Sequence, residues 1–166
     1  MKREGMSRAE RIRRHPRFKQ YIGEIAALEK ERIYCGHGLT HLLDTARIAY
    51  ILNLEEGSGL PQEWIYAAAL LHDIGKGEEY KQNGAHDEIG AEIAETVLAE
   101  CGFTPEEVFP IAQAVRNHRT KDGAAAPHPL SDCIRRADKL SRQCYTCTVA
   151  DTCKWPDEKK NFAIII

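Results

Sequence analysis

The sequence predicts an all-α fold in a single domain. Apolar residues recur at helical spacing along nearly all of its 166 residues, and no segment before the C-terminus alternates apolar and polar residues as a half-buried strand would. Prolines and capping residues stand where helices would begin, and glycines stand where they would end. We therefore expect one bundle of five to six core helices, followed by a short C-terminal appendix that contains cysteines.

The first three helices are predicted from apolar stripes and from the residues that bound them. The first covers residues 18–33, and the second covers residues 39–54 and ends before a Gly-Ser-Gly turn. The third covers residues 61–74, because Pro61 suits the first turn of a helix and Gly75 can stop one.

Three more helices complete the predicted bundle. Residues 86–101 form the fourth. The fifth covers residues 104–118, since Thr-Pro-Glu-Glu is a strong helix start, and Pro110 should kink it or restart it. The sixth covers residues 131–142.

Charge is spread unevenly along the chain. Residues 1–20 carry eight Lys or Arg against two Glu, a net +6 in a chain of net charge −2. Such an arm could contact nucleic acid or an anionic substrate, but no recognition motif accompanies it, so a solvated helical lead-in is favoured and nucleic acid is not an expected partner. We divide the chain into a basic lead-in at residues 1–17, a helical domain at 18–142, and a cysteine-containing tail at 143–166 packed on that domain.

Hydrophobicity bears on where the protein resides. No apolar run approaches the roughly 20 residues that a membrane span requires, and the basic N-terminus lacks the apolar core of a signal peptide. Hydrophobic residues make up 43% of the chain and charged residues 29%, as in ordinary soluble domains. We expect a cytoplasmic protein without a membrane partner.

Histidine and aspartate residues occur at the ends or on the inner faces of the predicted helices. In His72-Asp73, an apolar helix ends in an imidazole beside a carboxylate. Both groups need polar partners once they leave water, and a divalent ion such as Fe, Mn, Zn or Mg can satisfy both. If one aspartate were shared, six side chains could hold two ions with room for water. The candidates are His41, His72, Asp73, His86, His118 and Asp138.

Some of these residues have simpler explanations. His118 is favourable near a helix C-terminus because of the helix dipole, and His86 could be an exposed loop residue. His37 lies one helical turn before His41, so it is an alternative ligand or otherwise a pocket residue. Lys76 follows a glycine in a helix-ending loop, where lysines are often simply solvated.

The spacing of these residues resembles that of the HD-domain superfamily of metal-dependent phosphohydrolases. The family pattern is a His, then an adjacent His-Asp, then a distant Asp. It falls on His41, on His72-Asp73 with the following Ile-Gly-Lys, and on Asp138 in Arg-Ala-Asp-Lys-Leu.

The branch of the family with two metals has two further histidines. His86 in His-Asp-Glu-Ile-Gly-Ala and His118 in Arg-Asn-His match their places. The resemblance covers roughly residues 20–142 and implies an HD-like helical bundle around the metals. It also implies hydrolysis of a phosphate ester, often of a nucleotide or dinucleotide.

The resemblance further implies roles for individual residues. Asp73 would bridge two ions, with a water or hydroxide between them as the nucleophile, because coordination lowers the pKa of water from about 16 to about 7. Lys76 would act with Asp73 in catalysis by contacting a non-bridging phosphate oxygen. One ion would be held by His41, His72, Asp73 and Asp138, and the second by Asp73, His86 and His118. Further candidates for substrate binding are His37, Arg119 and Lys139.

The tail contains a C-x2-C-x5-C run formed by Cys144, Cys147 and Cys153. In a cytosolic protein, clustered cysteines more often bind metal or take part in redox chemistry than form structural disulfides. Three thiolates leave a tetrahedral metal one ligand short. Cys35 is our candidate for the fourth, because it precedes His41 by six residues and Cys144 follows Asp138 by six.

A separate zinc ion or Fe–S cluster is therefore an option for the tail. The spacing is not that of a standard zinc finger or ferredoxin, and free buried thiols or a disulfide formed on purification are the alternatives. Cys101 and Cys133 are interpreted as apolar core residues.

The sequence favours an enzyme that hydrolyses a phosphate ester of a nucleotide, a dinucleotide or a related small molecule. A complete set of metal ligands argues against a non-catalytic nucleotide-sensing module, since a pure binding module need not keep every ligand. A protein organised by a cysteine-bound metal is the third hypothesis. The expected partner is a small phosphorylated substrate, and the oligomeric state stays open, with a dimer among the options.

Overall fold

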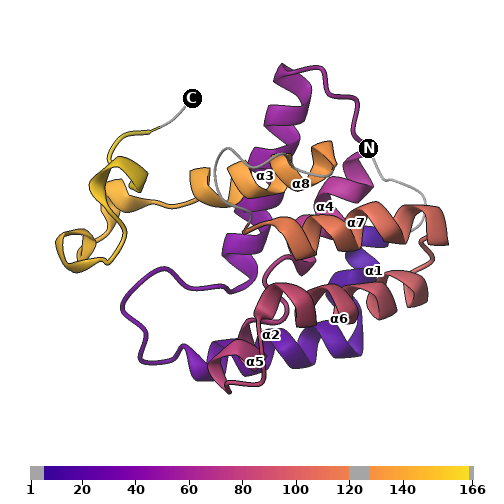
Figure 1. Cartoon of the computed structure of the whole chain (residues 1–166), viewed down its shortest axis with the longest axis horizontal. Helices are drawn as coiled ribbons and strands as arrows, with labels where there is room; N and C mark the ends of the chain where they lie inside the picture. Colours follow the sequence, from indigo (N-terminus) through magenta and orange to yellow (C-terminus); the bar gives the residue numbers. More distant parts are fainter. Residues whose placement is uncertain (1–5, 120–127, 165–166) are drawn as a thin grey trace.

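The computed structural model describes residues 6–119 and 128–164, and this part of the chain is helical without strands, which confirms the predicted all-α class (Figure 1). Within these residues, no helix is both long and apolar enough to cross a membrane. The α-helices are α1 (Arg8–Arg14), α2 (Pro16–Leu28), α3 (Leu39–Glu55), α4 (Gln62–Leu71), α5 (Lys76–Tyr80), α6 (His86–Glu100), α7 (Pro105–Asn117) and α8 (Pro129–Leu140). Three 3-10 turns follow, η1 (Cys144–Thr146), η2 (Ala150–Thr152) and η3 (Asp157–Lys159).

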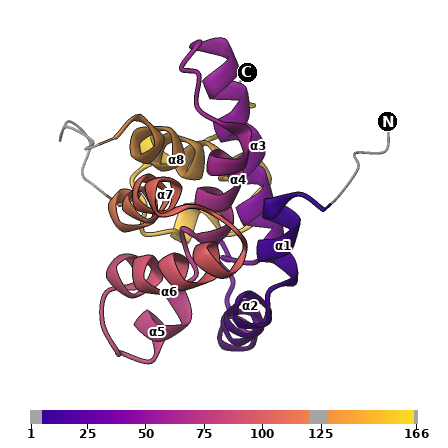
Figure 2. The same ribbon diagram turned by 90° about the vertical axis from the view of Figure 1, so that its right-hand side faces the viewer.

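Helix α4 lies at the centre of the bundle. Its residues Ala67, Ala68, Ala69 and Leu71 are fully buried. A helix that is apolar on every face is stable only when other elements cover it on all sides, and α4 contacts α1, α3, α6, α7 and α8, as Figures 1 and 2 show. The residues that follow α4 are therefore deep in the molecule, whatever their polarity.

The chain turns sharply after α4 because Gly75 lies directly against α6. A Cβ atom on Gly75 would lie 2.2 Å from the carbonyl oxygen of His86 and 2.8 Å from the nitrogen of Gly90. Only glycine allows two backbones to approach this closely. The contact fixes the start of α6 beside the end of α4.

Residues 8–14 of the basic N-terminal segment form α1, which packs against α4 and α2, whereas the sequence favoured a solvated lead-in. The predicted first helix, residues 18–33, corresponds to α2, which begins at Pro16 and ends at Leu28, and α1 was not predicted. Ile12 of α1 is fully buried, and Arg8 forms ion pairs with Glu63 and Glu107. The pattern missed α1 because a seven-residue helix with one buried residue has no apolar stripe to detect.

Other helix boundaries also differ from those predicted. The predicted helix over residues 61–74 ends at Leu71, and the short helix α5 was not predicted. Helix α8 starts at Pro129 rather than at residue 131, because proline fits the first turn. Helix α7 continues through Pro110 without restarting. The carbonyl that the proline leaves without a donor belongs to the exposed Glu106, where water can take its place.

The tail is attached to the end of α8. The side-chain amide of Asn161 donates to the carbonyl oxygens of Lys139, Leu140 and Arg142 at 2.9, 3.2 and 2.9 Å. These contacts add a donor to carbonyl groups at and just beyond the C-terminal end of α8. The guanidinium of Arg142 also lies 4.2 Å from the ring centroid of Trp155. Figure 1 shows the tail, in yellow, at one end of the molecule.

Candidate metal centre

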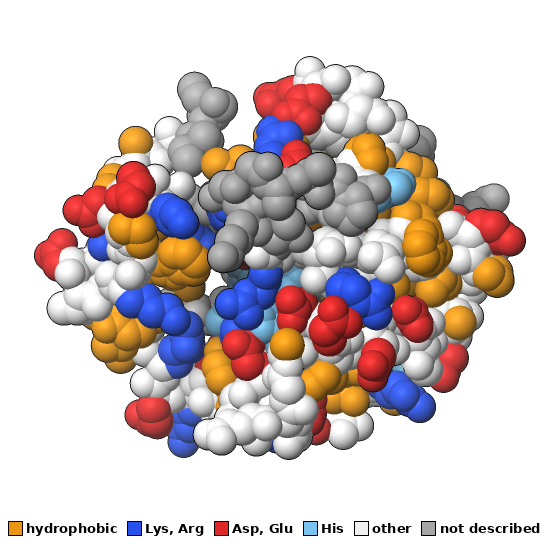
Figure 3. Space-filling model, viewed as in Figure 1, with side chains coloured by type: hydrophobic (Ala, Val, Ile, Leu, Met, Phe, Trp, Pro, Cys, Tyr) orange, Lys and Arg blue, Asp and Glu red, His pale blue; other side chains and the backbone are white. Residues whose placement is uncertain are grey.

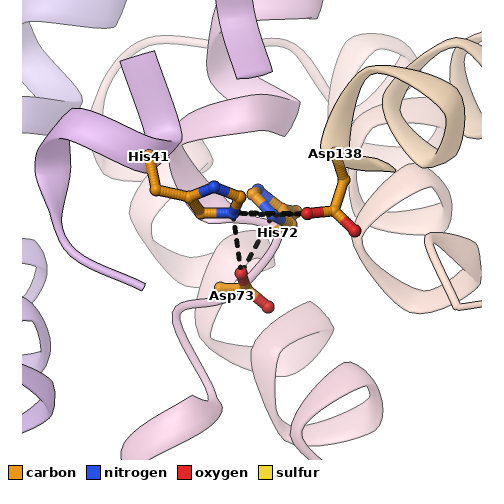
Figure 4. A group of neighbouring side chains, drawn as sticks. All are labelled: His41, His72, Asp73 and Asp138. Carbon is orange, nitrogen blue, oxygen red and sulfur yellow. Dashed lines mark hydrogen bonds and ion pairs between the residues drawn. The ribbon is translucent and has the colours of Figure 1, made fainter. Parts of the chain in front are cut away.

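Four potential ligands from three parts of the chain meet beyond the C-terminal end of α4. The Nε2 atom of His41, from α3, lies 3.2 Å from Nε2 of His72 and 3.3 Å from Oδ2 of Asp73. Asp138, from α8, places its Oδ1 3.3 Å from the same His41 atom. Figure 4 shows the four side chains pointing toward one another. Their ligand atoms all lie within 4.8 Å of one another, a spacing that suits a bound ion.

Asp73 also belongs to a second group, with His86 at the start of α6 and His118 at the end of α7. Its Oδ1 atom lies 3.5 Å from Nε2 of His86 and 3.6 Å from Nε2 of His118, and these two nitrogens are 3.2 Å apart. The other oxygen, Oδ2, is 3.0 Å from Nε2 of His72. The two oxygens of one carboxylate thus face two different histidine pairs, an arrangement that can bridge two ions.

Backbone carbonyls fix the tautomer of two of these histidines. The Nδ1 atom of His72 lies 2.7 Å from the carbonyl oxygen of Ala69, and Nδ1 of His118 lies 2.5 Å from that of Val115. A carbonyl oxygen only accepts hydrogen bonds, so each Nδ1 carries the proton. Each Nε2 is then left with a lone pair that points into the site.

The other two histidines reach the same state through side chains. Nδ1 of His86 bonds to the carboxylate of Glu79. The hydroxyl of Ser141 donates to the backbone carbonyl of Asp138 at 2.7 Å and is 3.2 Å from Nδ1 of His41, so it accepts the proton of that nitrogen. Four Nε2 lone pairs, close together beside two carboxylates, repel one another unless positive charge lies between them.

The pKa shifts follow from the same geometry. Burial disfavours protonated His72, but the charges of Asp73 and Asp138 outweigh it and raise its pKa well above the usual value. Burial also disfavours ionised Asp73, yet His72 holds its pKa well below the usual range. A proton on His72 therefore supplies positive charge between these carboxylates, as a bound cation would. Burial and the charge of Lys76 lower the pKa of His86 to about 4, which keeps this histidine neutral, as a metal ligand must be.

The site is enclosed on one side and open on the other. His72, Asp73, His86 and His118 are each at most 5% exposed, whereas His41 and Asp138 are half-buried. Figure 3 shows histidine surface, in pale blue, in a hollow of this face, with basic and acidic side chains around it. The half-buried His41 and Asp138 leave the ligand group accessible to a small molecule on this open side.

Two basic residues predicted to bind substrate, Lys76 and Arg119, both lie beside Glu79. The ammonium of Lys76 donates to Oε2 of Glu79 at 2.7 Å, and Nη1 of Arg119 lies 3.6 Å from its Oε1. Sequence reasoning missed Glu79. A ligand histidine usually has a carboxylate or carbonyl partner, so an acidic partner for His86 could be expected. Because α5 was not predicted, there was no reason in the sequence to choose Glu79 over Glu78 as that partner.

The other two substrate candidates lie outside the ligand groups. His37 bonds through Nδ1 to Glu29, and its ring centroid lies 6.0 Å from that of His41. Burial disfavours ionised Glu29, but hydrogen bonds from Tyr80 and His37 hold its pKa below the usual value. His37 is therefore a neighbour of a candidate ligand, held by Glu29. Lys139 is half-buried on α8, directly after the aspartate of the site.

Comparison with known proteins gives a family match and a relative that is similar along most of the chain. The HD domain model matches residues 38–143. An uncharacterized protein from Clostridium beijerinckii is 42% identical over 144 residues, which are 87% of this chain and 89% of the relative.

Other similarities cover parts of larger enzymes. A bifunctional uridylyltransferase/uridylyl-removing enzyme from Gluconobacter oxydans is 35% identical over 96 residues, which are 52% of this chain and 10% of that enzyme. Ribonuclease Y from a Sulfurovum species is 33% identical over 78 residues, which are 47% of this chain and 15% of the relative.

A crystal structure of a predicted HD superfamily hydrolase from an uncultured Thermotogales bacterium has a similar fold. It matches with a TM-score of 0.62 and 23% sequence identity, over 87% of this chain and 82% of the other. At that identity, the match shows the shared fold.

Proposed function

Since the chain belongs to the HD domain family, we propose that it is a metal-dependent hydrolase of phosphate esters, with nucleotides or dinucleotides as the favoured substrates. The observation that carries this proposal is the placement of Asp73, whose two oxygens face two histidine pairs. One ion would be held by His41, His72, Asp73 and Asp138, and a second by Asp73, His86 and His118.

The donor set fits divalent ions. Neutral imidazole nitrogens and carboxylate oxygens suit Fe, Mn and Zn, and carboxylates also suit Mg, so the metal stays open among these four. When bound, the ions would supply an activated water as the nucleophile and would neutralise charge on the phosphate oxygens.

Basic residues beside the second histidine pair can bind and orient the phosphate. Lys76 and Arg119 both bring positive charge to this side of the site, and Glu79 lies between them. An incoming phosphate would compete with Glu79 for these two cations. Glu79 would keep its bond to Nδ1 of His86 and so hold that ring in its ligand orientation.

The class of substrate is inferred from the relatives. Two of them are a uridylyl-removing enzyme and a ribonuclease, and both names refer to substrates that contain nucleotides. This supports nucleotides over sugar phosphates or phosphoproteins as the first compounds to assay.

A reconstitution assay tests the proposal. Metal-free protein is loaded separately with Fe²⁺, Mn²⁺, Zn²⁺ or Mg²⁺ and incubated with mononucleotides, dinucleotides and simple phosphate monoesters and diesters. We expect hydrolysis with at least one ion, abolished by Asp73→Asn and retained by Asp132→Asn, a carboxylate on α8 outside both ligand groups. Nucleotide binding without turnover under every condition would contradict hydrolysis and support a sensing module.

A further inference from the structure

Four of the six cysteines lie outside the hydrophobic core and outside the His/Asp site. All six are free thiols. Cys101 and Cys133 are buried, as the sequence predicts, and the Cys133 thiol donates to the carbonyl of Ala49. The other four are exposed or half-buried, and they are Cys35, Cys144, Cys147 and Cys153.

The metal centre brings the two cysteine-bearing segments together. Cys35 precedes His41 by six residues, and Cys144 follows Asp138 by six. His41 and Asp138 are in contact through Nε2 and Oδ1 at 3.3 Å, and Ser141 lies 3.2 Å from the same imidazole. The segment before α3 and the segment after α8 therefore leave the bundle at the same place.

A direct hydrogen bond joins these segments farther out. The hydroxyl of Tyr34 donates to the carbonyl oxygen of Thr152 at 3.1 Å, and the next residues in the chain are Cys35 and Cys153. The guanidinium of Arg32 also donates to the carbonyl of Cys35 at 2.7 Å and fixes the loop. In Figure 1, this loop after α2 extends toward the yellow tail.

Two 3-10 turns fold the tail so that its three cysteines stay near this loop. The N–H of Cys147 donates to the carbonyl of Cys144 at 3.2 Å, and the N–H of Cys153 donates to that of Ala150 at 3.2 Å. Burial raises the pKa of the Cys35 thiol, and the charges of the three tail cysteines raise it further. That influence is expected of thiols that are neighbours in space.

We propose that these four cysteines form a four-thiolate site for a thiophilic metal, either one zinc ion or an iron–sulfur cluster. Four thiolates complete the tetrahedral shell of a structural zinc site and also form the usual ligand set of an iron–sulfur cluster. Bound metal would tie the loop before α3 to the segment after α8, beside the open side of the His/Asp centre. The proposal does not depend on what that centre hydrolyses.

The spacing of the sulfur atoms decides how far the tail must move to hold each occupant. In the described residues, both groups of three or more possible ligand atoms that all lie within 4.8 Å of one another belong to the His/Asp centre, so no three of the cysteine sulfurs are that close together. Tetrahedral zinc needs sulfurs about 3.8 Å apart, given a Zn–S distance of about 2.3 Å. Zinc would therefore draw the tail inward, whereas a cluster needs less movement because its own iron and sulfide atoms fill the centre.

The test is metal and sulfide analysis of the full chain, purified without oxygen. The variants are Cys147→Ser and Cys153→Ser, with Cys101→Ala as a control for loss of a core cysteine and Asp73→Asn as a control that removes His/Asp-bound metal. Zinc, iron and acid-labile sulfide are counted per chain, and visible absorption reports a cluster.

We expect either one zinc ion or iron with matching sulfide that is lost in both serine variants and retained in Cys101→Ala and Asp73→Asn. Metal that remains at the His/Asp centre of the serine variants would show that they are folded. The proposal is overturned if Asp73→Asn contains no metal. It is also overturned if the metal retained in Asp73→Asn is still bound when Cys147→Ser or Cys153→Ser is combined with that substitution.

Discussion

The histidines of the candidate metal centre present Nε2 because each Nδ1 is bonded elsewhere. The acceptors are two backbone carbonyls, the hydroxyl of Ser141 and the carboxylate of Glu79. Such partners fix the orientation of a ligand ring and raise its basicity. Glu79 differs from the other three acceptors because it carries a negative charge. It should therefore contribute most to the affinity for an ion at the His86–His118 pair.

Replacement of Glu79 tests this role. We expect Glu79→Gln to weaken binding of the ion at the His86–His118 pair by about 10–100-fold, because a neutral amide supports the ligand ring less well than a carboxylate. The ion at the His41–His72 pair should bind with unchanged affinity. Metal titration followed by calorimetry separates the two sites, and Glu78→Gln is the control on the same helix. Equal weakening of both ions would contradict a local role for Glu79.

The six candidate ligands could be proposed from the sequence because chemistry and spacing restrict them strongly, and the structure brings them together in two groups that share Asp73. Their hydrogen-bond partners could not. Ser141 was within reach of sequence reasoning, since it lies one helical turn after Asp138. Glu79 was not, because its position depends on α5, a five-residue helix that leaves no periodic signal.

At the scale of elements, the close contact between the end of α4 and the start of α6 positions Asp73 and the second histidine pair. Gly75 and Gly90 form this contact, with a Cβ on Gly75 placed 2.2 Å from the His86 carbonyl. The sequence predicted Gly75 only as a helix stop. Its closeness to the backbone of His86 follows from the way α4 and α6 pack against each other.

Gly75→Ala is expected to push these helices apart. The free energy of unfolding should fall by about 1–3 kcal/mol, as for other overpacked sites, and the affinity for the second ion should fall with it. Urea denaturation and metal titration measure the two effects. The matched control is Gly23→Ala, an exposed helical position with nothing within 4 Å of the added Cβ, which should gain up to about 1 kcal/mol. Equal changes in the free energy of unfolding and in metal affinity for the two variants would show that the contact tolerates a side chain at position 75.

Helices of several turns with repeated apolar residues were the predictable elements of the fold. The central parts of α3, α4, α6, α7 and α8 lie within the predicted ranges, because each has a repeated apolar pattern over several turns. Short elements and helix ends were not predictable from pattern alone, since tertiary contacts decide them. Helix α1 shows this most clearly, with Ile12 as its only buried residue.

At the scale of the whole molecule, Arg8 joins the N-terminus to the bundle. It donates to Glu63 of α4 at 2.7 Å and to both oxygens of Glu107 on α7 at 2.6 and 3.0 Å. Its guanidinium also lies 4.1 Å from the centroid of the Phe103 ring. At least one of the basic N-terminal side chains therefore holds the N-terminal helix against the bundle. The net charge of the segment alone could not reveal this role.

We expect Arg8→Ala to lower the free energy of unfolding by about 1–3 kcal/mol, because it leaves two partly buried carboxylates without their charged donor. Arg17→Ala, at an exposed position of α2, is the control and should change stability by less than about 0.5 kcal/mol. Chemical denaturation at neutral pH measures both. A similar small effect for both variants would mean that Arg8 pairs too weakly to anchor α1.

The same ion pair predicts a dependence of stability on pH. Hydrogen bonds from Arg8 and from the backbone of Thr104 lower the pKa of Glu107 from 4.5 to about 2. A folded-state pKa below the unfolded value contributes stability that is complete above about pH 4.5 and is lost as the pH falls toward 2. Denaturation curves between pH 6 and 2.5 should show this loss, with a smaller loss in Arg8→Ala. The same slope in both proteins would rule out the pair as its source.

The central claim is that Asp73 bridges two ions, and metal counting at the His/Asp centre tests it most directly. Ions are counted in the Cys147→Ser background, so that cysteine-bound metal does not contribute, together with hydrolysis of the best substrate. We predict two ions per chain, loss of both ions and of activity in Asp73→Asn, and loss of only one ion in His86→Ala. One ion per chain at saturation, or two ions retained in Asp73→Asn, would contradict the bridge.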